Sequence, residues 1–193
     1  YKRQTKYRYG FTGTLDGTQT HKWVLEGLFG PSYKIISTKK LQDAGYLAKL
    51  NIKVLLMKHE SQKFDTYEDE VQYIINHDKR NKFIKNLAHD LKGNTLILYS
   101  RVATHGQVLF DLINIGNRKV FFVHGGVDAQ EREEVRRITE TEKDAIIVAS
   151  FGTFSTGINI KNLHNIIFAS PSKSRIRTLQ SIGRVLRLSL IHI

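Results

Sequence analysis

The sequence predicts an α/β fold in which a parallel β-sheet is flanked by helices. Four short runs of β-branched, aromatic and aliphatic residues are typical of strands buried on both faces. They lie at residues 95–99, 120–123, 145–149 and 165–168. Stretches that favour helices lie between and after them, at 104–115, 130–140 and 174–188. Because strands that alternate with helices form βαβ units, we expect parallel strands joined by right-handed crossovers.

The segment before these strands gives shorter signals. Residues 7–12 favour a strand that ends at a turn at Asp16-Gly17, and residues 21–29 favour a short helix. Gly30-Pro31 then breaks the chain. The prediction continues with an extended segment at 33–37, a brief helix, a second extended segment at 52–58, and helices at 67–76 and 81–91.

Two acidic motifs are interpreted as helix starts. Asp128-x-x-Glu131 has the capping-box pattern for the helix at 130–140, and Gly125-Gly126 provides the turn before it. Asp69-Glu70 stands at the start of the helix at 67–76, where carboxylates interact favourably with the helix dipole. We therefore assign this acidic pair a structural role rather than metal binding.

Length and composition limit the class of protein. The 193 residues suit one α/β domain with a remnant of another, and the first nine residues resemble the middle of a longer chain. No apolar run approaches the ~20 residues that cross a bilayer, so no membrane partner is expected. The chain has no cysteine, which excludes a disulfide framework and a cysteine-based zinc site. This composition is compatible with a reducing cytosol, and we expect a cytoplasmic protein.

Positive charge is concentrated at the end of the chain. Thirty Lys and Arg residues against 18 Asp and Glu residues give a net charge of +12, and no acid follows Asp144. Such a field attracts a polyanion such as a nucleic-acid backbone or a nucleotide. The alternative is a basic surface that serves solubility alone.

Polar or glycine-rich residues follow each predicted strand. They are Ser100 and Arg101, the run 124–126, the run 150–159 and the run 170–173. In open parallel sheets ligands bind at the carboxyl ends of the strands, so this edge is the predicted site. Glycine and serine are also routine connection residues, which is the alternative for any one of these runs.

The last predicted helix carries charge on one side. At 100° per residue, Gln180, Arg184 and Arg187 fall within about 60° of one another, and a separate apolar side is formed by Leu179, Ile182 and Leu186. Gly183 has no side chain, so the surface of the helix beside Arg184 is open and a ligand or a facing domain could approach the helix backbone. Two arginines at this spacing can hold a polyphosphate; the alternative is a solvated basic helix.

Taken together, these patterns resemble the motifs of superfamily 2 helicases, ATP-driven motors that move along nucleic acid. Residues 149–159 resemble motif V and residues 180–187 motif VI, whereas Phe11-Thr-Gly-Thr14 and residues 95–101 resemble motifs III and IV. The resemblance covers nearly the whole chain and is closest to DNA helicases of phage recombination and repair. It implies a RecA-like fold, with residues 1–32 as the end of the first lobe and residues 33–193 as a second lobe truncated at its C-terminus.

The resemblance also implies roles for individual residues. Arg184 and Arg187 would act as arginine fingers on ATP, with Gln180 near the nucleotide or the attacking water. Gly157, Asn159 and Gly183 would lie by the nucleotide, although many relatives have Asp where Asn159 stands. The implied contacts to the nucleic acid are Arg101, His105, Ser150, Thr153 and Lys173. Thr12 and Thr14 would couple the ATP-binding cleft between the lobes to the surface that binds the nucleic acid.

ATP and Mg²⁺ would be bound mainly by a first lobe that these residues lack. The sequence contains neither a Gly-Lys-Ser/Thr loop nor an Asp-Glu-x-Asp/His motif, so we expect the fragment alone to be inactive. The partners implied are DNA and the first lobe, and the oligomeric state stays open. Two other functions stay open as well: a non-catalytic nucleic-acid-binding α/β module and an RNA helicase.

Overall fold

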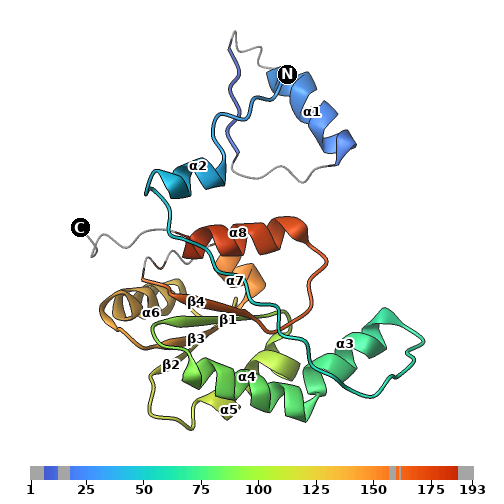
Figure 1. Cartoon of the computed structure of the whole chain (residues 1–193), viewed down its shortest axis with the longest axis vertical. Coiled ribbons are helices and arrows are strands. Elements are labelled where there is room, and N and C mark those ends of the chain that lie inside the picture. Colours follow the sequence, from blue (N-terminus) through green and yellow to red (C-terminus); the bar gives the residue numbers. More distant parts are fainter. Residues whose placement is uncertain (1–6, 13–17, 157–159, 161, 187–193) are drawn as a thin grey trace.

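The computed structural model describes residues 7–12, 18–156, 160 and 162–186. Its centre is a four-stranded parallel sheet with the order β2-β3-β1-β4 (Figure 1). The strands are β1 (Thr95–Tyr99), β2 (Val120–Val123), β3 (Ile146–Ser150) and β4 (Asn165–Phe168). The predicted α/β fold with a parallel sheet is confirmed, and each strand lies within one residue of its predicted position.

Helices cover both faces of the sheet (Figure 1). On one face α4 (Asp78–Asp90) and α5 (Gln107–Ile113) pack against Ile97, Tyr99 and their neighbours. On the other face α6 (Ala129–Thr141), α7 (Phe151–Thr156) and α8 (Arg175–Val185) cover Leu96 and Leu98. Because successive side chains of a strand point to opposite faces, one strand supplies both cores. The central strands β1 and β3 are fully buried, whereas the edge strands β2 and β4 are only partly buried.

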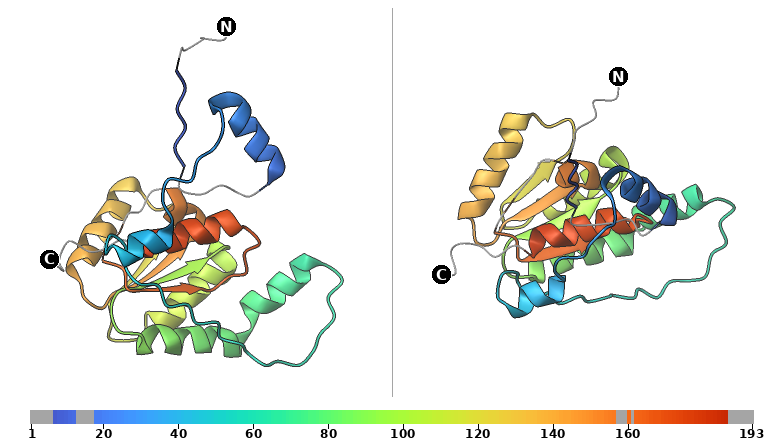
Figure 2. Two further views of the ribbon diagram at one scale, coloured as in Figure 1. Left: turned by 45° about the horizontal axis from the view of Figure 1, so that its top comes forward. Right: turned by 90° about the horizontal axis from the view of Figure 1, so that it is seen from above.

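The chain before the sheet is less regular than predicted. Residues 7–12 form no strand, and neither do the segments at 33–37 and 52–58. A strand requires a hydrogen-bonded neighbour, and no described residue pairs with these segments. The helices of this part are α1 (Gln19–Phe29), α2 (Thr38–Asp43) and α3 (Tyr67–Asn76), in agreement with the sequence. The α1 helix buries no residue and stands away from the sheet (Figures 1 and 2).

Four helix details differ from the prediction. The helix expected at 104–115 begins as a π-helix, Val102–Gly106, before α5, and α7 was not predicted. Asp128 occupies the N-cap position of α6, but its side chain makes no capping hydrogen bond. In α8 the buried residue is Ser181, whereas Leu179, expected on the apolar side, is 41% exposed. No helix in the described part of the chain is long and apolar enough to cross a membrane.

A buried polar anchor fastens the amino-terminal ends of the strands. The Asn94 side chain donates to the carbonyl oxygens of Thr139, Glu142 and Asn162 at 2.7–2.9 Å, and its Oδ1 accepts from the Ala145 amide at 2.8 Å. One amide side chain therefore ties the connections before β1, β3 and β4 together.

Arg118 makes a second anchor at the same edge. Its guanidinium donates to the carbonyl oxygens of Ala88, Leu91 and Gly93 at 2.6–2.8 Å, and it pairs with Asp144 at 3.0 Å. Burial lowers the pKa of Arg118, while the Asp144 carboxylate raises it. Asn94 and Arg118 thus fix the connections at the amino-terminal edge of the sheet.

Candidate nucleotide and nucleic-acid interface

The carboxyl ends of three strands meet at one edge, as the sequence predicted. Tyr99 at the end of β1 is in register with Ser150 at the end of β3. On the other side of β1, the Ser100 amide donates to Ser170 Oγ at 3.0 Å. The fold thus brings together strand-end residues that are up to 70 positions apart in the sequence.

His105 lies beneath this edge rather than on it. The residue is fully buried, and its Nδ1 shares a 2.9 Å hydrogen bond with Ser170 Oγ. Burial and the nearby Arg80 charge lower the pKa of His105 to about 4, so the ring is neutral at pH 7. His105 therefore lies under Ser170 rather than at the surface, and its phosphate contact stays a prediction.

Two cations at this edge, the half-buried Arg101 and the exposed Lys173, contact α3. Arg101 donates to the Glu68 carboxylate at 2.5 Å, and the Lys173 ammonium lies 3.9 Å from the centre of the Tyr67 ring. The hydrogen bond from Arg101 lowers the pKa of Glu68. Sequence reasoning missed both α3 partners, because the interaction spans 33 positions for Arg101 and no local pattern marks it.

Ser150 and Thr153 are joined to each other at the start of α7. Their hydroxyls lie 2.8 Å apart, and Ser150 Oγ also accepts from the Thr153 amide at 3.3 Å. Both residues are buried, at 8% and 5% exposure. Ser150 therefore satisfies a free amide of the first turn of α7, and Thr153 lies beside the loop that contains Gly125, 3.9 Å from where a Cβ of that glycine would stand.

The α8 helix presents the motif VI residues with different exposures. Gln180 is exposed, and Gly183 is exposed with no atom within 4 Å of the position of a Cβ. Arg184 is half-buried, and its guanidinium carbon lies 5.5 Å from the centre of the Phe154 ring on α7. Nothing inside the described part of the chain requires glycine at position 183.

Several predicted site residues lie outside the described residues. These are Thr14, Gly157, Asn159 and Arg187. Thr12 is described and exposed, in a segment without regular secondary structure.

Mg²⁺ is the metal expected with ATP, held mainly by a first lobe. Mg²⁺ prefers carboxylate and other oxygen ligands. Among the residues that the structure describes, no group of three or more His, Asp or Glu could hold a metal ion.

Comparison with known proteins identifies the family of this chain. Residues 78–189 match the model of the "Helicase conserved C-terminal domain" family. The chain is 37% identical over 189 residues to the "ATP-dependent DNA helicase uvsW" of Enterobacteria phage T4, covering 94% of this chain and 38% of that protein. It also matches the crystal structure of T4 UvsW with a TM-score of 0.56 and 43% identity, covering 64% of this chain and 25% of that one. The chain spans less than half the length of the relative it matches, and it belongs to the superfamily 2 helicases as a UvsW-like fragment that contains the conserved C-terminal helicase domain.

Proposed function

We propose that this chain is the second lobe, with the end of the first, of an ATP-dependent DNA helicase or translocase that acts in recombination or repair. The boundary between the two parts falls at residues 32 and 33. Membership of the helicase family supports the function of an ATP-driven motor. The name of the phage relative supports ATP and DNA as the ligands of this motor. The helix α1, which precedes this boundary, supports it because α1 buries no residue against the sheet.

The observation that carries the proposal is the arrangement of α8. Ser181 and Leu186 are buried, while Gln180 and Gly183 are exposed and Arg184 is half-buried against Phe154. A guanidinium packed on an aromatic ring has a restricted set of positions, which suits a group that must meet a phosphate from across a cleft. We assign Arg184 and Arg187 as arginine fingers and place Gln180 near the nucleotide or the attacking water.

The chain supplies one half of the ATP site in this proposal. Arginine fingers stabilise charge on the transferred phosphoryl group and are worth roughly 10³ to 10⁵ in rate. Gly157, Asn159 and Gly183 would form the remaining nucleotide contacts of this lobe. Mg²⁺ and the phosphate-binding lysine belong to the first lobe, so the 193 residues alone would not hydrolyse ATP.

The DNA track in this proposal runs along the carboxyl edge of the sheet. Arg101 and Lys173 would contact phosphates there, with Ser150 and Thr153 at the start of α7, and His105 would act from below by holding Ser170. Thr12 and Thr14 would couple the nucleotide cleft to this track. The net charge of +12 supports a polyanionic partner, because positive residues attract the phosphate backbone.

The test uses the intact enzyme that contains this chain. Arg187→Ala and Arg184→Ala are each expected to lower DNA-stimulated ATP hydrolysis by at least 10³-fold while DNA affinity changes by less than about threefold. Arg177→Ala is the matched control, because Arg177 is an exposed arginine on the same helix and outside the motif.

Unchanged ATP turnover in both variants would refute the finger assignment. If instead the intact protein bound DNA but hydrolysed no ATP, it would be a nucleic-acid-binding module. RNA that competes equally with branched DNA for binding and stimulation would point to an RNA helicase.

A further inference from the structure

The apolar side of α3 runs from the interior of the protein to its surface at the carboxyl edge of the sheet. Tyr67, Val71 and Ile75 follow one another at a spacing of four residues, so they lie on one side of the helix. Ile75 is 1% exposed and Val71 is 8% exposed, whereas Tyr67, in the first turn, is 48% exposed. The ring of Tyr67 therefore extends this apolar side into solvent.

One cation contacts this ring, and a second is bound by the next residue of the helix. The Lys173 ammonium lies 3.9 Å from the centre of the Tyr67 ring, and Arg101 donates to the carboxylate of Glu68. Lys173 follows β4 and Arg101 follows β1, and these two strands are paired. An ammonium over an aromatic face restricts the positions of both side chains. This part of the edge thus presents an exposed ring close to two positive charges.

The rest of the Tyr67 ring is open to a ligand. Among the described residues, no other aromatic ring packs against it. Of the three acids in the first turn of α3, Glu68 is paired with Arg101, and Asp69 accepts a hydrogen bond from the Thr66 hydroxyl at 2.7 Å. The acid next to the ring is therefore neutralised by a neighbouring cation.

We propose that Tyr67 stacks on a base of single-stranded DNA that crosses the carboxyl edge. This inference rests on the proposed DNA function and adds a base contact to a track that otherwise contacts phosphates. Lys173 and Arg101 would hold the phosphates next to the stacked base. Proteins that bind single strands combine positive charge with exposed rings, because every base has a flat face and every nucleotide a phosphate. The bases of a duplex are already stacked on one another, so Tyr67 would favour single strands over duplex.

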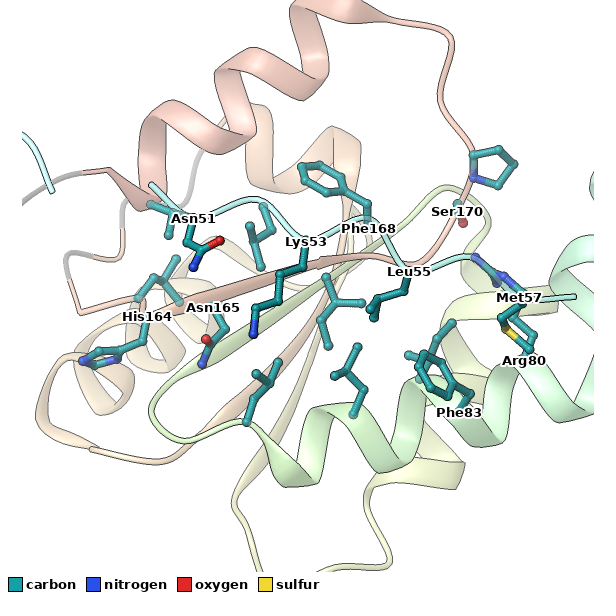
Figure 3. Close-up of a pocket in the computed structure, with 18 of the residues that line it drawn as sticks. Asn51, Lys53, Leu55, Met57, Arg80, Phe83, His164, Asn165, Phe168 and Ser170 are labelled. Atoms are coloured by element: carbon teal, nitrogen blue, oxygen red, sulfur yellow. The ribbon is translucent and has the colours of Figure 1, made fainter. Parts of the chain in front are cut away.

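The stacking position is separate from the large groove beside β4. The groove has a volume of about 1030 Å³ and lies between the extended segment of residues 48–59, α4, β4 and the end of α8, with Leu55 and Met57 in its lining (Figure 3). Neither Tyr67 nor Lys173 belongs to this lining. A base on Tyr67 therefore lies at the carboxyl edge, on the path of a strand that contacts Arg101 and Lys173, and not in the groove.

Fluorescence anisotropy with the intact enzyme that contains this chain tests the proposal. The probes are a fluorescein-labelled oligothymidylate and an abasic oligomer of the same length, which keeps the phosphates but has no bases. Tyr67→Ala is expected to weaken binding of the oligothymidylate by at least about fivefold and to change binding of the abasic oligomer by less than about twofold. Tyr67→Trp keeps a flat ring, so its affinity for the oligothymidylate should stay within about twofold of that of the unchanged enzyme.

Two further variants separate stacking from charge. Lys173→Ala should weaken both oligomers by a similar factor, because it removes a phosphate contact. Tyr46→Ala removes a tyrosine that is 72% exposed after α2, and it should leave both affinities unchanged. Equal losses of the two oligomers in Tyr67→Ala would overturn the stacking assignment alone, because Tyr67 would then act only by holding Lys173. An unchanged enzyme that binds neither oligomer would overturn the DNA function together with this assignment.

Discussion

Replacing Asn94 by alanine tests whether one side chain holds the amino-terminal ends of the strands together. The Nδ2 group has two hydrogens shared among three carbonyl oxygens, and Oδ1 accepts one amide. Asn94→Ala therefore removes at least three hydrogen bonds at a site with no exposure, at about 1 kcal/mol each. The Ala145 amide is also left buried without its partner, which raises the expected loss to about 3 to 5 kcal/mol in the free energy of unfolding.

Urea unfolding followed by circular dichroism measures this loss. With a slope of about 2 to 3 kcal/mol per molar urea, the midpoint should fall by roughly 1 to 2 M. Asn86→Ala is the matched control: Asn86 is exposed on α4, where alanine favours the helix, so stability should rise by a few tenths of a kcal/mol. If Asn94→Ala shifted the midpoint no more than Asn86→Ala, the anchor would have no energetic role.

Three further results are expected. Gly106→Ala should lower the thermal unfolding midpoint strongly, because a Cβ would stand 2.4 Å from the Tyr99 ring. Gly183→Ala should raise this midpoint slightly, because the site is open and alanine favours the helix. Equal shifts in the two variants would contradict the packing of Gly106 against Tyr99. Lowering the pH from 6.5 to 4 should cost about 3 kcal/mol of stability through His105, because the unfolded ring binds a proton near pH 6.5 and the folded ring only near pH 4. The urea midpoint of His105→Asn should fall less between pH 7.5 and 4.5 than that of the unchanged protein, and parallel curves would refute this assignment. Arg118→Lys should lower the free energy of unfolding in urea by about 2 to 4 kcal/mol, because one ammonium cannot reproduce the guanidinium's hydrogen bonds to Ala88, Leu91 and Gly93. A loss below about 1 kcal/mol would show that these hydrogen bonds are dispensable.

The strands were predictable because their apolar runs are short and each ends at a polar or glycine-rich turn. β1 and β3 are the clearest cases, since both are buried along their whole length. The segment at 52–58 has the same β-branched and aliphatic character but forms no strand. Local sequence reports the tendency to extend, whereas pairing depends on a neighbour that the pattern does not show.

The helix α7 escaped prediction because its sequence favours other structures. Phe151–Thr156 contains glycine, serine and threonine, which are weak helix formers. It forms because Ser150 caps its first turn, and because Phe151 and Phe154 are buried in the core. Tertiary packing thus decides the structure where local propensity is poor.

The candidate site was predictable by position but not by contacts. The carboxyl edge follows from the parallel sheet, and Ser100, Ser150 and Ser170 gather there as expected. His105 follows a strand end, but it lies in the π-helical turn and is buried against Ser170. The sequence alone does not show which way a side chain points after an irregular turn.

If Arg101 contacts DNA as proposed, its ion pair with Glu68 affects how DNA affinity depends on salt. A cation that gives up a mobile counterion when it meets a phosphate adds about one unit to the logarithmic salt slope. Arg101 would instead exchange one fixed anion for another, and the Glu68 carboxylate would return to water. Its share of the slope should therefore be small, and Glu68→Gln should steepen the slope while tightening the complex at low ionic strength.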